Sequence, residues 1–124
     1  MITTTLRGSR IAGIATAVPE RCCGIPELAA LFGQEEASKL AKSTGVFQRR
    51  IAGDGLCTSD LCLAAAVRLL KDLAWDPATI QGLIFVSQTP DHRLPATACV
   101  LHGKLGLAKG CVAFDVNLGC SGYV

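Results

Sequence analysis

The stretch GCVAFDVNLGCSGY, residues 110–123, decides the interpretation of this 124-residue sequence. Its central run, Val112–Val116, is short and rich in β-branched and aromatic residues, which predicts a strand buried on both faces. The small residues that follow predict a tight turn. Cys120 lies in this turn, with Gly119 before it and Gly122 two residues after it. The sequence therefore places one cysteine at the end of a buried strand.

Cys120 has the predicted surroundings of a reactive thiol. If a helix begins at the turn, its sulfur faces unpaired backbone N–H groups and the positive end of the helix dipole, and both favour the thiolate. The thiolate is the form of cysteine that acts as a nucleophile. Gly119 and Ser121 leave room for an acyl thioester, and the N–H of Cys120 can donate to an oxyanion. The alternative is a buried structural cysteine, and we expect that role for the other six.

The rest of the chain alternates between strand and helix patterns. Apolar runs predict strands, and proline, glycine and charge patterns predict helix ends. Thr58 or Ser59 is expected to cap the longest helix, which is apolar over most of its circumference and should be mostly buried. The alternation predicts an α/β layered fold in one domain, residues 1–124. The expected strands are Arg10–Ala17, Val46–Ala52 and Leu83–Ser87, and the expected helices are Pro26–Phe32, Glu35–Lys42, Asp60–Ala74 and Pro95 to about Leu105.

The composition is unusually apolar for a domain of this length. Half of the residues are apolar, 18% are charged, and the mean hydropathy is +0.41. Either a membrane protein or a piece of a larger protein with covered apolar faces would have this composition. The longest apolar runs, such as Leu61–Val67, are far shorter than the roughly 20 residues that span a bilayer. No signal pattern begins the chain. We therefore expect a piece of a larger protein and no membrane partner.

Charge and cysteine content exclude several classes of function. The net charge is +2 without a basic stripe, so nucleic acid is not an expected partner. The seven cysteines include no Cys-x-x-Cys pair, and the two histidines do not complete a metal site. The sequence thus predicts no metal, and a cytoplasmic protein with reduced thiols.

Residues 110–123 resemble the nucleophile segment of ketoacyl-ACP synthase III, a branch of the thiolase superfamily. Other stretches agree with the family in order and spacing, so that the resemblance spans essentially the whole chain. They are Ile11-Ala-Gly-Ile with Val18-Pro19, Ser43-Thr-Gly-Val with Arg49-Arg-Ile-Ala, Asp76–Gln88, and Leu94-Pro-Ala-Thr-Ala-Cys. The resemblance implies a five-layered α/β/α/β/α thiolase fold built of two similar halves. This chain would be the amino-terminal half, ending just after the nucleophile turn.

The resemblance also implies a reaction. A primer acyl group is transferred to the cysteine, here Cys120, and a malonyl-ACP carbanion then attacks the thioester in a decarboxylating Claisen condensation. The family's catalytic histidine and asparagine, and a glycine that completes the oxyanion hole, lie in the second half. His92 and His102 do not match them, and we expect a surface or helix-packing role for both.

Substrate and partner residues are implied in the same way. Leu94 matches a position that reaches into the acyl pocket of the partner subunit, and Thr44 and Arg49 lie in a matching segment near the substrate. The tryptophan and arginine that hold the adenine of acyl-CoA in the family are here Lys39 and Ser43. This argues against a CoA primer held by adenine stacking and favours an acyl-ACP donor or a different thioester, and the choice between CoA and ACP stays open. The implied partners are an acyl carrier protein, the missing carboxy-terminal half and a second copy of the chain, with no cofactor besides the thioester substrate.

Two other functions stay open. The parent protein could be an acyltransferase or a head-to-head condensing enzyme of the same superfamily, using the same cysteine. The chain could also be a structural half that is inactive alone.

Overall fold

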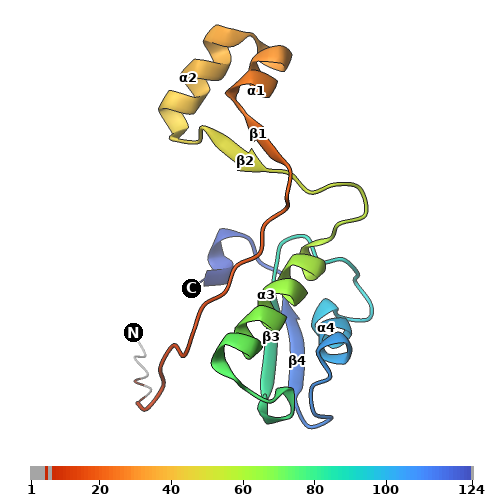
Figure 1. The fold of residues 1–124 in the computed structure, drawn as a ribbon. Coiled ribbons are helices and arrows are strands. Elements are labelled where there is room, and N and C mark those ends of the chain that lie inside the picture. The colour runs from red at the N-terminus through yellow and green to blue at the C-terminus, as the bar shows by residue number, and fades with distance from the viewer. Residues whose placement is uncertain (1–4, 6, 124) are drawn as a thin grey trace.

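The computed structural model describes residue 5 and residues 7–123, which form two parts joined by extended segments (Figure 1). The first part contains two short strands and two helices, and the second contains two longer strands, two helices and two short 3-10 helices. In chain order these are β1 (Cys22–Gly24), α1 (Ile25–Phe32), α2 (Gln34–Thr44) and β2 (Gln48–Arg50), then α3 (Thr58–Leu73), a 3-10 helix (Pro77–Thr79), β3 (Gly82–Val86), α4 (Thr97–Leu105), β4 (Val112–Val116) and a 3-10 helix (Cys120–Tyr123).

The second part is organised around a parallel pair of strands. β3 and β4 pair in register from Gly82 opposite Val112 to Val86 opposite Val116. Parallel neighbours need a crossover connection, and α4 lies in the segment that provides it. The core consists of apolar side chains from both strands and from helices α3 and α4: Phe85, Ala98 and Leu101, with Cys62, Leu63, Leu83 and Ala113 packed against them. The predicted α/β class and the strand Val112–Val116 are thus confirmed. The predicted strand Leu83–Ser87 forms one residue earlier, as β3.

Only one face of this two-stranded sheet is covered within the described residues. Side chains alternate along a strand, and those of Phe85 and Ala113 face the core. The side chains between them remain between 44% and 60% exposed: Ile84, Val86, Val112 and Phe114. The prediction of strands buried on both faces is therefore wrong for this part of the chain, because both helices contribute to the same side.

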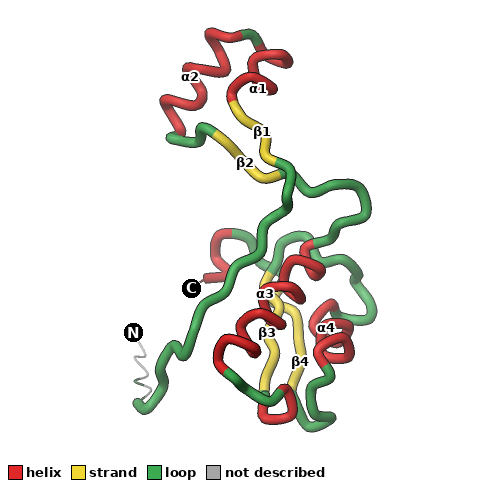
Figure 2. Tube along the Cα trace, in the orientation of Figure 1, coloured by secondary structure: helices red, strands yellow, loops and turns green. Residues whose placement is uncertain are grey.

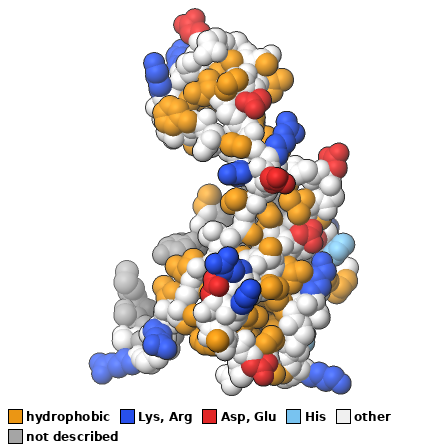
Figure 3. Space-filling model, in the orientation of Figure 1, with side chains coloured by type: hydrophobic (Ala, Val, Ile, Leu, Met, Phe, Trp, Pro, Cys, Tyr) orange, Lys and Arg blue, Asp and Glu red, His pale blue; other side chains and the backbone are white. Residues whose placement is uncertain are grey.

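Helix α3 is also less buried than its sequence predicts. Ser59 is its one fully buried residue, and Val67 is 54% exposed. Cys62 and Leu63 pack against the core and Leu69 meets the segment around Gly13, but the other apolar residues of α3 are at most partly buried. On the face shown in Figure 3, apolar side chains accordingly lie at the surface of both parts.

The start of α3 differs from the expected Thr58 or Ser59 cap. Cys57 occupies the N-cap position, and its N–H donates to the Asp60 carboxylate at 3.0 Å. The N–H of Ser59 donates to Asp91 Oδ1 at 3.3 Å, and its hydroxyl donates to the other oxygen of that carboxylate. Ser59 is thus bound by a distant aspartate and does not cap the helix itself, which local spacing could not reveal.

Helix α4 begins two residues later than predicted. Pro95 follows a cis peptide bond and lies before the helix, whose N-cap is Ala96. The first two helical N–H groups, those of Thr97 and Ala98, donate to the Asp115 carboxylate at 2.8 and 2.7 Å. The start of α4 is therefore fixed by a residue of β4, and not by the proline.

The predicted strand Arg10–Ala17 is wrong. This segment is extended but forms no ladder, and it runs as a loop beside α3 (Figure 2). Gly13 approaches the helix so closely that an added Cβ would lie 2.9 Å from Leu69 Cδ1. Ile11 and Ile14 remain exposed, because β3 and β4 pair with each other and no described strand pairs with this segment.

The first part is a helical hairpin on a small antiparallel pair. β1 pairs with β2, which keeps only three residues of the predicted strand Val46–Ala52. α1 begins at Ile25, one residue before the predicted Pro26. α2 begins one residue before the predicted Glu35 and continues two residues beyond Lys42. Gly45 ends α2 with a φ of +73°, a backbone conformation that favours glycine.

None of the helices in residues 7–123 is long and apolar enough to cross a membrane.

Candidate active site around Cys120

The turn that carries Cys120 has the tight geometry that the sequence predicts. After β4, the N–H of Leu118 donates to Val116 O at 3.1 Å, and the N–H of Gly122 donates to Gly119 O at 2.9 Å. Cys120 is the first residue of a four-residue 3-10 helix. The turn leaves its side chain exposed as a free thiol.

An open hollow of about 610 Å³ lies beside Cys120. It is formed by the end of β3 and the turn after β4, two segments far apart in the sequence. The lining residues are Val86, Ser87, Gln88, Leu118, Gly119, Cys120 and Gly122. The thiol therefore borders a space that a small acyl group can enter from solvent.

Two glycines lie near Cys120, and Gly122 is required by packing against β3. A Cβ added at Gly119 would lie 2.9 Å from Gln88 Oε1, and one at Gly122 would lie 2.7 Å from Val86 Cγ1. Both distances are shorter than ordinary contacts, but the end of the Gln88 side chain can move away, whereas Val86 belongs to β3. The sequence predicted that small neighbours would leave room for a substrate. The structure adds that they let the turn rest directly on the neighbouring strand.

Leu94, the predicted acyl-pocket residue, does not line the Cys120 hollow. It lies in the loop before α4 and is 89% exposed. An apolar side chain that is so exposed makes few contacts within the described chain. Its expected contact with a partner subunit stays a prediction.

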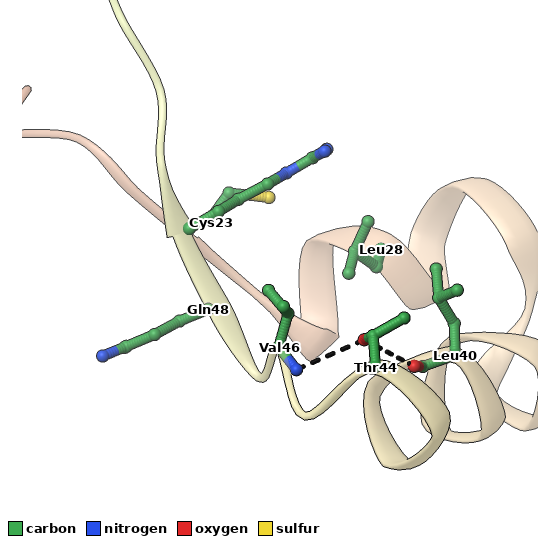
Figure 4. A pocket seen from close by; sticks show the side chains of 7 residues that line it. Cys23, Leu28, Leu40, Thr44, Val46 and Gln48 are labelled. Atoms are coloured by element: carbon green, nitrogen blue, oxygen red, sulfur yellow. Dashed lines mark hydrogen bonds between the residues drawn. The ribbon is translucent and has the colours of Figure 1, made fainter. Parts of the chain in front are cut away.

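Thr44 and Arg49 lie in the first part of the chain, at a separate pocket of about 200 Å³ (Figure 4). The Thr44 hydroxyl donates to Leu40 O at 2.8 Å and accepts from Val46 N–H at 3.2 Å. This side chain therefore has a structural role at the end of α2. The structure does not bring either residue to the Cys120 hollow, and their assignment to the substrate stays a prediction.

Most of the other cysteines are not the buried apolar residues that we expected. Among the six, only Cys23 and Cys111 are buried. Burial raises the pKa of the partly buried Cys62 thiol, and the nearby Asp91 carboxylate raises it further. Exposure alone therefore does not distinguish Cys120 from Cys22, Cys57 and Cys99.

The two histidines have the structural roles that the sequence predicts. His92 is exposed in a loop, and His102 Nε2 lies 3.0 Å from Ala108 O at the end of α4. Neither lines the hollow beside Cys120. The part of the chain that the structure describes holds no group of three metal-ligating side chains.

Sequence reasoning missed three polar residues that shape this region. Asp91 binds the start of α3, Asp115 binds the start of α4, and Gln88 lines the hollow. The two aspartates act on residues 32 and 18 positions away. No local spacing signals such contacts, although a carboxylate inside a buried strand, as at Asp115, could have indicated a capping role.

The comparisons with known proteins agree with this geometry. No protein-family model matches the chain. A curated relative, the beta-ketoacyl-[acyl-carrier-protein] synthase III of Rhodopirellula baltica, is 39% identical over 119 residues, which cover 96% of this chain and 33% of the relative. The chain spans about a third of the length of the curated relatives that it matches.

Solved structures show the same fold. The 3-oxoacyl-(acyl-carrier protein) synthase of Burkholderia xenovorans matches with a TM-score of 0.83 and 42% identity, over 89% of this chain and 32% of that protein. The tetronic acid condensing enzyme AbyA1 matches with a TM-score of 0.74 and 26% identity, over 87% and 35%. The resemblance to ketoacyl-ACP synthase III and its thiolase-type fold is thus confirmed. Over nearly its whole length, the chain is homologous to the 3-oxoacyl-ACP synthase III proteins and shares the fold of the matching third of these proteins.

Proposed function

We propose that this chain supplies the nucleophile of a condensing enzyme of the 3-oxoacyl-ACP synthase III type. In the first step, the Cys120 thiolate attacks the carbonyl carbon of an acyl thioester. The carrier leaves as a thiol after protonation, and the acyl group stays on Cys120 as a new thioester. The Cys120 N–H donates to the oxyanion that forms at the carbonyl oxygen.

In the second step, malonyl-ACP loses CO₂ and its carbanion attacks the Cys120 thioester. A carbon–carbon bond forms, the carbon–sulfur bond breaks, and the Cys120 thiolate is released with a 3-oxoacyl-ACP. The described residues offer no general acid or base at Cys120, since His92 and His102 lie elsewhere. The groups for this step therefore belong to a carboxy-terminal half, and the chain alone is expected to be inactive in condensation.

The observation that carries the proposal is the setting of Cys120. Its free, exposed thiol stands at the end of β4, in a turn that glycines hold against β3, beside an open hollow. The three other exposed cysteines do not line this hollow. The names of the homologous proteins support the same chemistry, because they specify acyl-carrier-protein synthases.

Trapping of the acyl-enzyme tests the proposal. The full-length protein is incubated with an acyl thioester without malonyl-ACP, and the modified residue is located by peptide mass mapping. The label is expected on Cys120 and should be absent from Cys120→Ala. A label on Cys99 or Cys111, with Cys120 unmodified, would overturn the assignment.

A different condensation or a simple acyl transfer is the second candidate. One of the structurally similar proteins is named a tetronic acid condensing enzyme, so this fold also occurs with a different condensation. Decarboxylation separates the candidates, because only the first consumes malonyl-ACP with release of one CO₂ per product. Release of labelled CO₂ from malonyl-ACP therefore distinguishes them.

The same proposal includes the partners of the chain. An acyl carrier protein delivers the malonyl group. The primer arrives as a thioester of an acyl carrier protein or of another carrier, and Lys39 and Ser43 provide no aromatic surface for the adenine of CoA. The bare apolar face of β3 and β4 supports a carboxy-terminal half packed on this part of the chain. A two-fold dimer through β4 is also proposed, with Leu94 entering the acyl pocket of the partner subunit.

A further inference from the structure

Gln88 lies at the edge of the sheet where the nucleophile turn begins. The N–H of Ser87 donates to Val116 O at 3.1 Å, so the pairing of β3 with β4 continues to the residue before Gln88. Because the strands are parallel, β3 and β4 both end at the same edge of the sheet. β3 continues into Gln88, and β4 continues into the Cys120 turn.

The Gln88 side chain rests on the turn itself. Its Oε1 atom lies 2.9 Å from the position that a Cβ of Gly119 would occupy. The Cα atoms of Gly119 and Cys120 are about 3.8 Å apart, as in any trans peptide unit. The carboxamide therefore lies against the residue before Cys120, in the same hollow that Cys120 lines.

This carboxamide is also available for a ligand. Within the described residues it makes no hydrogen bond to the protein, and its residue is exposed in the hollow. The neighbouring Ser87 hydroxyl, in contrast, accepts from Thr89 N–H at 3.0 Å. Gln88 is thus the polar side chain of the hollow with both a free donor and a free acceptor.

We infer that Gln88 is a substrate-binding residue, and that its carboxamide pairs with a secondary amide of the thioester's carrier arm. The inference rests on the proposed function, in which the acyl donor is a carrier thioester, and both acyl carrier protein and CoA present their thioester on a pantetheine arm. That arm carries an amide two carbons from its sulfur. A secondary amide offers one donor and one acceptor, which a carboxamide complements in full, whereas a thioester carbonyl offers only an acceptor.

The test compares two thioesters of the same acyl group in the full-length protein. The N-acetylcysteamine thioester keeps the amide, and the S-pentyl thioester replaces it by methylene groups of similar length. The rate constant for acylation of Cys120 is measured by intact mass spectrometry as a function of thioester concentration. The variants are Gln88→Ala, Gln88→Glu, which keeps an acceptor but loses the amide donor, and Gln81→Ala as the matched control. Gln81 is an exposed glutamine at the opposite end of β3.

The expected result is a selective loss. Gln88→Ala and Gln88→Glu should acylate about five-fold more slowly with the N-acetylcysteamine thioester, the effect of one neutral hydrogen bond. With the S-pentyl thioester, wild type and Gln88→Ala should differ by less than about two-fold. Gln81→Ala should match the wild type with both.

Equal losses of Gln88→Ala with both thioesters, or no loss with either, would overturn the inference while leaving the proposed function intact. Failure of the wild-type protein to be acylated on Cys120 by either thioester would instead overturn the proposed function.

Discussion

Asp115→Ala is expected to destabilise the protein strongly, although the residue is neither catalytic nor part of an ion pair in the described chain. Its carboxylate accepts the N–H groups of Thr97 and Ala98 at 2.8 and 2.7 Å. Those two residues are 1% and 0% exposed, so water cannot replace the lost acceptor without rearrangement. A hydrogen bond to a charged group contributes about 1.5–3 kcal/mol, and a buried donor left unpaired costs about 1–3 kcal/mol.

The expected loss in the free energy of unfolding is therefore about 3–5 kcal/mol for Asp115→Ala. This is a large fraction of the roughly 5–15 kcal/mol that stabilises a typical protein. Asp115→Asn keeps one acceptor oxygen and turns an amide donor toward the other N–H, so it should lose about half of this amount or more. Urea denaturation of the full-length variants measures the loss, and hydrogen exchange at the Thr97 and Ala98 amides locates it.

Asp72→Ala is the matched control. Asp72 pairs with Arg68 one turn away on the exposed side of α3, with Arg68 Nε and Asp72 Oδ2 2.7 Å apart. Such exposed pairs contribute only about 0.3–0.5 kcal/mol. If Asp115→Ala is no more destabilising than Asp72→Ala, or if the two amides stay protected, the carboxylate does not hold the start of α4 as the distances indicate.

Three further predictions follow from the same structure. The N–H of Cys57 holds the pKa of Asp60 below its usual 3.8, so this carboxylate stabilises the start of α3 above about pH 4 and loses that effect as the pH falls through the lowered pKa. Circular dichroism should therefore show a smaller acid-induced loss of helix in Asp60→Asn than in the wild type. An unchanged acid transition would contradict this role of Asp60. Gly122→Ala places a Cβ 2.7 Å from Val86 Cγ1 and should slow acylation of Cys120 about ten-fold or more. Gly110→Ala should not slow it, because the added Cβ has no atom within 4 Å. Equal rates in the two variants would mean that the turn does not rest on β3. Residues 1–124 alone should not form a stable monomer, because leaving ~800 Å² of apolar surface uncovered forfeits about 20 kcal/mol; a monodisperse 12.9 kDa species with cooperative melting in light scattering and calorimetry would refute this.

The sequence was sufficient wherever the deciding interactions are local. The strand Val112–Val116 has the predicted bounds, and the turn after it forms through hydrogen bonds between residues two and three positions apart. Helix ends set by glycine were also predictable, since α1 ends at Phe32 and α4 at Leu105, each followed by a glycine. Because such signals lie within a few residues of the feature that they determine, one sequence contains them in full.

The errors concern residues whose partners are distant in the chain. The start of α4 is set by Asp115, and Ser59 is bound by Asp91, which spacing along a helix cannot reveal. Gln88 reaches the nucleophile turn only because β3 and β4 are neighbours in a parallel sheet. Burial was overestimated for the same reason, since an apolar pattern predicts that a face is covered without specifying which segment covers it.

Where the Cys120 turn contacts the end of β3, the turn positions the reacting sulfur and the end of β3 forms the wall that faces the substrate. Gly122 has no room for a side chain, because an added Cβ would lie 2.7 Å from Val86 Cγ1 and should displace the turn. Val86 is held by the same contact, whereas Ser87 and Gln88 complete the opposite wall, and the exposed Gln88 side chain can change in polarity without pressing on the turn. Selectivity for the acyl donor can therefore be redesigned on one strand while the reacting atom stays fixed by the other.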